Sequence, residues 1–224
     1  MLSFVGTSLL VLLGQAPVAE TDLSPAPTEY RGHPLFLHGP TNTLLYKAAD
    51  GSLCGHERWD VKTGQDTDAG SVNLSASKKT TAAQLRVLKR PASLPPAKRA
   101  NDVEKTVYQL ENVKLTQFRR ESTDSDYHLV LQSGSTTMIA EIPSPSCVDG
   151  GPFLNLIKKA RAALDAKVPG AEAMFVWNKP GATVTVRGVG FFDFPHQQTG
   201  AAPNQIELHP VIGICFSNNC QIAN

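Results

Sequence analysis

The chain of 224 residues lacks several features that would assign it directly to a class of protein. Beyond an N-terminal apolar run, no stretch approaches the roughly 18 apolar residues that a membrane-spanning helix requires. The cysteines form no Cys-x-x-Cys pair of the kind that holds zinc, and no serine stands in a Gly-x-Ser-x-Gly turn. Gly188 and Gly190 lack the spacing and the following helix of a phosphate-binding loop. None of these motifs therefore assigns a function to the chain.

A charge of one sign is also lacking, since 21 basic and 20 acidic side chains give a net charge of +1. The total hides an asymmetry, because residues 78–120 carry 11 basic and 3 acidic side chains. We expect this proline-interrupted basic segment either to lie as a strap across an acidic domain or to bind a polyanion, although aromatic residues for base stacking make up only 7%. The candidate ligand-binding residues are Lys89, Arg90, Lys98, Arg99, Arg119, Arg120 and Tyr127.

The N-terminus resembles a secretory signal peptide. Residues 2–13 form an apolar run, and small residues follow it up to residue 19, although no basic residue precedes the run. We therefore expect residues 1–19 to be a signal peptide and the protein to be secreted or periplasmic. The alternative is a buried N-terminal strand or helix.

The four cysteines favour disulfides, because their number is even and the chain is expected to be exported. Cys215 and Cys220 flank a short, turn-rich loop that suits a local clip. Cys54 and Cys147 would then tie the early segment to the main domain. Four cysteines allow three pairings, however, and the sequence does not select one.

The hydrophobic pattern predicts three strands, one helix and two further strands. The strands are expected at 106–118, 127–131, 136–142, 183–192 and 205–211, and the helix at 153–168. A change of phase near Glu111 predicts a β-bulge, and the two glycines in the fourth strand suit a sharp bend. This order predicts a mainly β, OB-fold-like five-stranded barrel over residues 102–216. An α+β sandwich without closure is the alternative.

The remaining segments are expected to decorate this domain. Residues 20–101 predict an irregular N-terminal extension that includes the basic strap, and residues 217–224 predict a C-terminal tail.

Five sequence motifs lie at residues 57–63 (ERWDVKT), 126–131 (DYHLVL), 137–143 (TMIAEIP), 188–194 (GVGFFDF) and 206–211 (IELHPV), with His196, Thr199, Gly200, Pro203 and Asn204 between the last two. Together they resemble a family of uncharacterised bacterial secreted proteins. The resemblance covers roughly residues 55–214 and implies no assigned reaction. Members of this family often carry glycine where Gln197 and Gln205 stand, a difference that could stiffen or occlude the intervening loop.

A set of polar side chains lies along these predicted strands. Polar side chains two residues apart on one strand share a face, and the sequence repeats this spacing in the second and fifth predicted strands. Two histidines with carboxylates could bind a divalent metal and activate water, or serve as general acid and base. The alternative is a hydrogen-bonded network that fixes strand ends. The candidate catalytic residues are Asp126, His128, Glu141, Asp193, His196, Glu207 and His209.

A second feature is the run Glu57-Arg58-Trp59, with Lys62 nearby. Trp and Arg together often anchor an interface. The alternative is a tryptophan that docks the N-terminal extension onto the barrel, with Arg58 paired to a carboxylate.

These observations favour an exported binding or structural module whose ligand is a polyanion or a glycan, with no cofactor. One alternative is a secreted metal-dependent phosphodiesterase or nuclease, which requires a divalent metal and the convergence of the candidate residues around a cavity. The other is a scaffold that binds an envelope protein, which requires an exposed apolar patch around Trp59.

Overall fold

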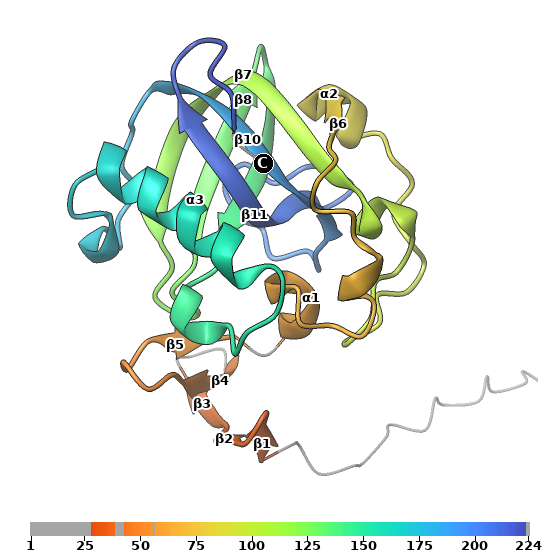
Figure 1. Ribbon diagram of the computed structural model, residues 1–224, viewed down its shortest axis with the longest axis vertical. Coiled ribbons are helices and arrows are strands. Elements are labelled where there is room, and N and C mark those ends of the chain that lie inside the picture. The colour runs from red at the N-terminus through yellow and green to blue at the C-terminus, as the bar shows by residue number, and fades with distance from the viewer. Residues whose placement is uncertain (1–27, 39–42, 56, 223–224) are drawn as a thin grey trace, which may run out of the picture.

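The computed structural model describes residues 28–38, 43–55 and 57–222. The expected signal peptide at residues 1–19 lies outside this part of the chain. Figure 1 shows a barrel with a helix across its side and a set of short strands from the N-terminal part of the chain beneath it.

Five strands form the barrel, and they follow the order of elements predicted from the sequence. The sheet runs β10-β11-β9-β8-β7 and closes because β10 also pairs with β7. β9 and β11 are parallel, and the other neighbours are antiparallel. This is an OB-fold-like barrel, so the predicted fold is confirmed and the open sandwich is wrong. The strands are β7 (Val107–Arg120), β8 (Tyr127–Ser133), β9 (Thr136–Ile142), β10 (Ala182–Phe192) and β11 (Ile206–Phe216).

Two predicted irregularities let the sheet bend into a barrel. Val184 pairs with Val113 and Val186 with Leu110, so two residues of β7 face one residue of β10. This bulge lies at residues 111–112, as the change of phase predicted. In β10, a Cβ at Gly190 would come within 2.5 Å of the Val103 carbonyl oxygen, so only glycine fits this close backbone approach.

The helix α3 (Leu154–Lys167) connects β9 to β10 and packs against β11 and β9. Its buried stripe includes Ile157, Ala160 and Leu164, which join the apolar interior of the barrel. This apolar interior is the hydrophobic core of the domain, and its burial stabilises the fold.

The N-terminal extension is more ordered than its composition indicates. Its short elements pack on the barrel, and β6 adds to the sheet as a parallel neighbour of β7. Helix α2 begins with a capping box between Thr81 and Gln84, which explains why one turn is stable there. The elements are β1 (Glu29–Tyr30), β2 (His33–Pro34), β3 (Phe36–His38), β4 (Thr43–Lys47), β5 (Leu53–Cys54), α1 (Trp59–Thr63), η1 (Ala69–Ser71), β6 (Lys78–Thr80) and α2 (Ala82–Leu85), with η2 (Asp102–Lys105), η3 (Pro145–Cys147) and η4 (Ala171–Ala173) inside the domain.

Both disulfides considered in the sequence analysis are present. Cys54 bonds to Cys147, and Cys215 bonds to Cys220. Trp59 Nε1 and the Tyr46 hydroxyl both donate to the carbonyl of Cys147, so the first disulfide lies in a small second core. Within the described residues, the helices are all too short or too polar to cross a membrane.

Removal of the first disulfide should destabilise the protein more than removal of the second. Cys54 and Cys147 lie 93 residues apart, whereas Cys215 and Cys220 lie 5 apart. Since a longer closed loop restricts the unfolded chain more, we expect Cys54→Ala with Cys147→Ala to cost about 4 to 5 kcal/mol in free energy of unfolding. The matched Cys215→Ala/Cys220→Ala pair should cost about 2 kcal/mol. Urea titration of both variants measures this, and equal losses would contradict it.

Candidate functional site

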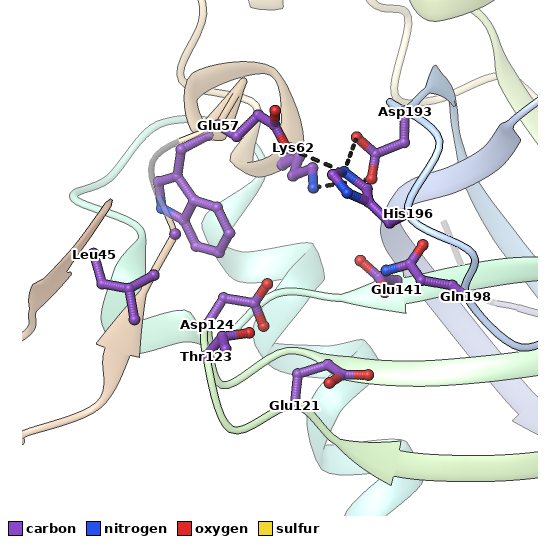
Figure 2. Close-up of a pocket in the computed structure, with 12 residues that line it drawn as sticks. Leu45, Glu57, Lys62, Glu121, Thr123, Asp124, Glu141, Asp193, His196 and Gln198 are labelled. Atoms are coloured by element: carbon purple, nitrogen blue, oxygen red, sulfur yellow. Dashed lines mark hydrogen bonds and ion pairs between the residues drawn. The ribbon is translucent and has the colours of Figure 1, made fainter. Parts of the chain in front are cut away.

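The candidate site is a cavity of about 230 Å³ between the barrel and the N-terminal extension. It opens where α1 and the turn between β7 and β8 meet the loop between β10 and β11 (Figure 2). Carboxylates dominate its lining, and one lysine and one histidine oppose them. The lining residues are Leu45, Gly55, Glu57, Trp59, Lys62, Glu121, Thr123, Asp124, Glu141, Asp193, His196 and Gln198.

Behind the cavity, four side chains alternate as acid and base. His128 Nδ1 lies 2.7 Å from Glu141 Oε1, and His209 Nδ1 lies 3.1 Å from Glu141 Oε2. His209 Nε2 lies 3.2 Å from Asp126 Oδ2. We call these four residues the histidine–carboxylate chain. All four are at most 3% exposed.

Sheet register brings this chain together. His128 and Glu141 are direct partners across β8 and β9, and residue 207 of β11 pairs with residue 139 of β9. Their neighbours Leu129, Ala140 and Leu208 point into the core. By the alternation of strands, the polar side chains therefore lie on the outer face of the barrel, where the loop between β10 and β11 covers them.

The surroundings of both histidines favour the imidazolium form. His209 has a carboxylate at each ring nitrogen, while His128 has Glu141 at Nδ1 and the Thr199 carbonyl at Nε2. Burial alone would lower the pKa of His209, but the contacts with Asp126 and Glu141 raise it to about 9. Burial would likewise lower the pKa of His128, and Glu141 raises it. The two imidazoliums hold the pKa of Glu141 well below its usual range despite its burial.

The pKa values of two other carboxyl groups at the site are raised rather than lowered. Burial and the charges of Asp126 and Glu141 raise the pKa of Asp124 well above its usual range. Burial, Glu141 and Asp193 do the same for the pKa of Glu207. The site therefore combines one carboxyl group of lowered pKa with two of raised pKa, an arrangement that permits acid–base chemistry.

Two cations face this concentration of acid groups. Lys62 Nζ donates to Asp193 Oδ2 at 3.2 Å, and Asp193 with Glu141 raises the pKa of this lysine although burial opposes it. At the mouth of the cavity, His196 Nε2 lies 3.1 Å from Glu57 Oε2 and 3.8 Å from Asp193 Oδ1. The contact with Glu57 raises the pKa of His196.

The structure brings together all seven residues that the sequence analysis selected as catalytic candidates. Asp126, His128, Glu141 and His209 form the chain, Asp193 and His196 lie at the mouth, and Glu207 Oε2 lies 3.9 Å from His209 Nδ1. The sequence pattern does not place Glu57, Lys62, Glu121 and Asp124 in this site. Glu57 and Lys62 belong to a segment far away in the sequence. Glu121 and Asp124 lie in a turn, and no periodic pattern shows which way a turn points.

The candidate ligand-binding residues have different environments. Lys89 and Lys98 are exposed. Arg90 donates to the carbonyl of Asp193, Arg119 pairs with Glu121, and Arg120 pairs with Glu172. Most of these cations therefore interact with the protein itself.

Two of these candidates are buried, and for them a surface role is corrected. Arg99 pairs with Asp66 at 2.7 Å, and both side chains are fully buried. Tyr127 is 0% exposed, packs in the core and donates its hydroxyl to Asp165, so its ring offers no stacking surface. Apolar packing explains this, because Tyr127 lies edge-on to Phe118 inside the barrel.

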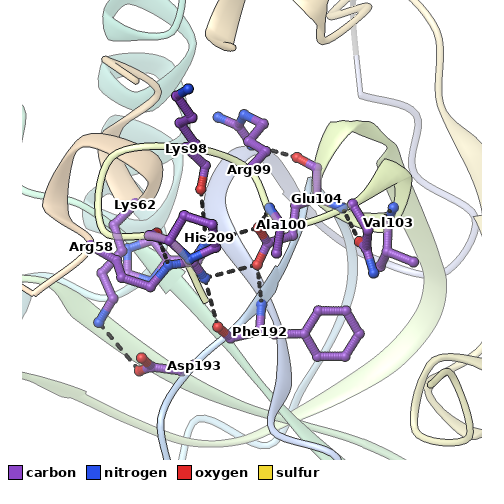
Figure 3. Close-up of polar contacts among 12 residues, drawn as sticks. Arg58, Lys62, Lys98, Arg99, Ala100, Val103, Glu104, Phe192, Asp193 and His209 are labelled. Carbon is purple, nitrogen blue, oxygen red and sulfur yellow. Dashed lines mark hydrogen bonds and ion pairs between the residues drawn. The ribbon is translucent and has the colours of Figure 1, made fainter. Parts of the chain in front are cut away.

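Trp59 and Arg58 dock the N-terminal extension onto the barrel. Trp59 is 1% exposed, so the exposed apolar patch required by the scaffold alternative is not present around it. Both terminal nitrogens of Arg58 contact the Glu104 carboxylate at 2.8 Å (Figure 3).

The loop over the site contains two strained positions. Gln197 and Gln205 have φ of 53° and 60°. This left-handed region suits glycine and disfavours residues with a Cβ, so both glutamines place some strain in the loop.

The fold and the site define an OB-fold-like barrel with a buried histidine–carboxylate chain beside a polar cavity. No family model and no curated protein matches this chain. Among solved structures, it is similar to a putative aspartyl-tRNA synthetase from Leishmania major Friedlin, with 15% identity and a TM-score of 0.36. The match covers 66% of this chain and 22% of that chain.

The histidine–carboxylate chain predicts that stability falls as the pH rises. A pKa raised from 6.5 to about 9 means that folded His209 retains a proton which the unfolded chain has lost. Its stabilisation is therefore complete below pH 6.5 and disappears as the pH passes 9, a loss of about 3 kcal/mol from this group. Urea titrations between pH 6 and pH 9.5 measure it.

Two comparisons assign this effect to His209. NMR titration of the wild-type ring should give the raised pKa directly. The His33→Ala variant, which changes a half-buried histidine outside the histidine–carboxylate chain, should keep the full pH dependence. Constant stability across this range, or a His209 ring that titrates near pH 6.5, would contradict the assignment.

Proposed function

We propose that the protein is an exported carbohydrate-binding module and that its cavity holds one neutral or amino-bearing sugar unit of a glycan. The observation that carries this proposal is the lining of the cavity, in which carboxyl groups and the Gln198 amide supply hydrogen-bond acceptors. Sugars present many hydroxyl donors, and such a lining complements them. The two disulfides are compatible with an extracellular location.

The size of the cavity supports a small ligand. Pockets for drug-sized molecules measure roughly 300–1,000 Å³, and this one is about 230 Å³. One ring with its hydroxyls suits this volume better than an extended chain. The rest of a glycan would then lie outside the mouth, near Glu57 and His196.

The charge of the cavity argues against a polyanion. Five carboxyl groups line it against Lys62 and His196, so a phosphate or sulfate group entering it would find few cationic partners and several acidic neighbours. Most of the basic candidates are occupied by contacts within the protein, as described above. An amine on the ligand would gain from the same field.

A hydrolase is the second candidate, and the position of three predicted residues, Glu141, Asp193 and His196, in the lining of one cavity favours it. Asp124, whose pKa is raised by burial and neighbouring carboxylates, and Glu141, whose pKa is lowered by the two histidines, both line the cavity. A general acid beside a carboxylate that stabilises positive charge is the arrangement required for cleavage of a glycosidic bond. Binding and cleavage of the same ligand class are therefore compatible.

Isothermal titration of the full chain with defined oligosaccharides tests this proposal. Probes are a glucose oligomer, an N-acetylglucosamine oligomer, its deacetylated form, a sulfated oligosaccharide and single-stranded DNA. We expect an uncharged or amino-bearing oligomer to bind, and Asp124→Asn and Gln198→Ala to weaken it about tenfold or more through loss of polar contacts. Gln132→Ala, outside the cavity, is the matched control and should bind normally.

The other outcomes separate the alternatives. Binding confined to the sulfated oligomer or to DNA, with a steep loss in added salt, would contradict the proposal. Release of shorter products from a bound oligomer, abolished in Asp124→Asn, would support the hydrolase.

A further inference from the structure

We infer that Glu57, Asp193 and His196 form a binding site for one divalent transition-metal ion, Zn²⁺ or Mn²⁺, at the mouth of the cavity. We call these three residues the mouth triad. This site does not depend on sugar binding and goes beyond the proposed function.

The donor atoms have the spacing of ligands around a common ion. Each residue offers one ligand atom, and these atoms lie within 4.8 Å of one another. His196 Nε2 is 3.1 Å from Glu57 Oε2 and 3.8 Å from Asp193 Oδ1. Bonds of roughly 2.0–2.2 Å from an ion to nitrogen and oxygen place neighbouring ligands roughly 3.0–3.6 Å apart. The triad therefore needs only small side-chain movements to close on an ion (Figure 2).

One ligand is fixed while the other two are accessible. The Asp193 side chain is 2% exposed, and its Oδ2 accepts from Lys62 while its Oδ1 accepts from the Phe194 amide at 2.8 Å. These contacts orient the carboxylate, as outer contacts do for metal ligands. Glu57 and His196 are 52% and 40% exposed, so an ion can enter from solvent.

The donor set selects the class of ion. One imidazole and two carboxylates suit Zn²⁺ and Mn²⁺, whereas Mg²⁺ and Ca²⁺ prefer oxygen ligands alone. Three protein ligands leave at least one coordination position open. Because the triad lines the cavity, that position faces the space where we place the sugar.

The lining of the cavity is also rich in carboxyl groups. Five of them line it, and Lys62 and His196 are the basic side chains among the lining residues. A divalent cation at the mouth would be attracted by this surplus of carboxyl groups.

A second trio in the described residues has suitable spacing but different chemistry. Asp126, Glu141 and His209 also lie within 4.8 Å of one another. There, both nitrogens of His209 face carboxylates, and all three residues are buried, so an ion would have to displace an existing charge pairing inside the protein. The mouth triad is therefore the better site.

Calorimetric titration of the chelator-treated full chain with ZnCl₂, MnCl₂ and MgCl₂, without sugar, tests the inference. We expect one Zn²⁺ or Mn²⁺ per chain, at least tenfold tighter than Mg²⁺, and a higher melting temperature with the ion bound. His196→Ala and Glu57→Gln should each weaken binding at least tenfold. Both positions are partly exposed, so these variants should fold, which circular dichroism checks.

His33→Ala is the matched control, because His33 also makes a surface contact with a carboxylate, Asp149, at 3.9 Å. It should bind the ion like the wild type. Absence of Zn²⁺ and Mn²⁺ binding, equal affinity for Mg²⁺, or unchanged binding in His196→Ala would each overturn the inference. Because no sugar is present, its failure leaves the carbohydrate proposal to its own experiment.

Discussion

The buried pair of Arg58 and Glu104 is the interaction on which the rest of the site depends. Arg58 donates to both Glu104 oxygens at 2.8 Å and to the Phe192 carbonyl at 2.8 Å, and Glu104 accepts from the Phe192 amide at 2.9 Å (Figure 3). One guanidinium thus joins α1 to the end of β10. Trp59 and Lys62 follow Arg58 on α1, and Asp193 follows Phe192. The pair therefore sets the distance between opposite walls of the cavity. Buried charges are tolerated only with such full pairing. Removal of one partner would leave an unpaired buried charge and strongly destabilise the fold.

The five-stranded barrel could be predicted because its strands carry local signals. Alternation marked the strands, the stripe containing Ile157 and Leu164 marked α3, and the change of phase near Glu111 marked the bulge. The N-terminal elements could not be predicted in this way. Strands such as β1 and β2 have two residues each, too few for a periodic pattern, and they depend on contacts with distant residues.

The site was predictable in part for the same reason. The spacing of Glu207 and His209 placed both on one strand face, and the structure keeps them together. The partner of Arg58 could not be named, because 46 residues of irregular chain separate it from Glu104. The burial of these polar residues could not be predicted either. An outward-facing polar residue on a strand is usually solvated, yet the loop between β10 and β11 and the N-terminal extension cover this face and leave His209 0% exposed.

The structure shows how the basic and acidic side chains behind the near-neutral net charge are paired. Part of the basic segment is used internally: Arg99 neutralises Asp66 in the interior, and Arg90 binds the backbone at Asp193. The segment thus acts largely as a strap across the protein, one of the two roles that its sequence allowed. These arginines do not neutralise the carboxylates of the cavity, where Lys62 and the histidines must balance the charge. The acidic cavity is therefore a product of how the basic residues are distributed. Since the buried arginines of the described residues are paired elsewhere, the cavity keeps a surplus of carboxyl groups that would favour a cationic ligand.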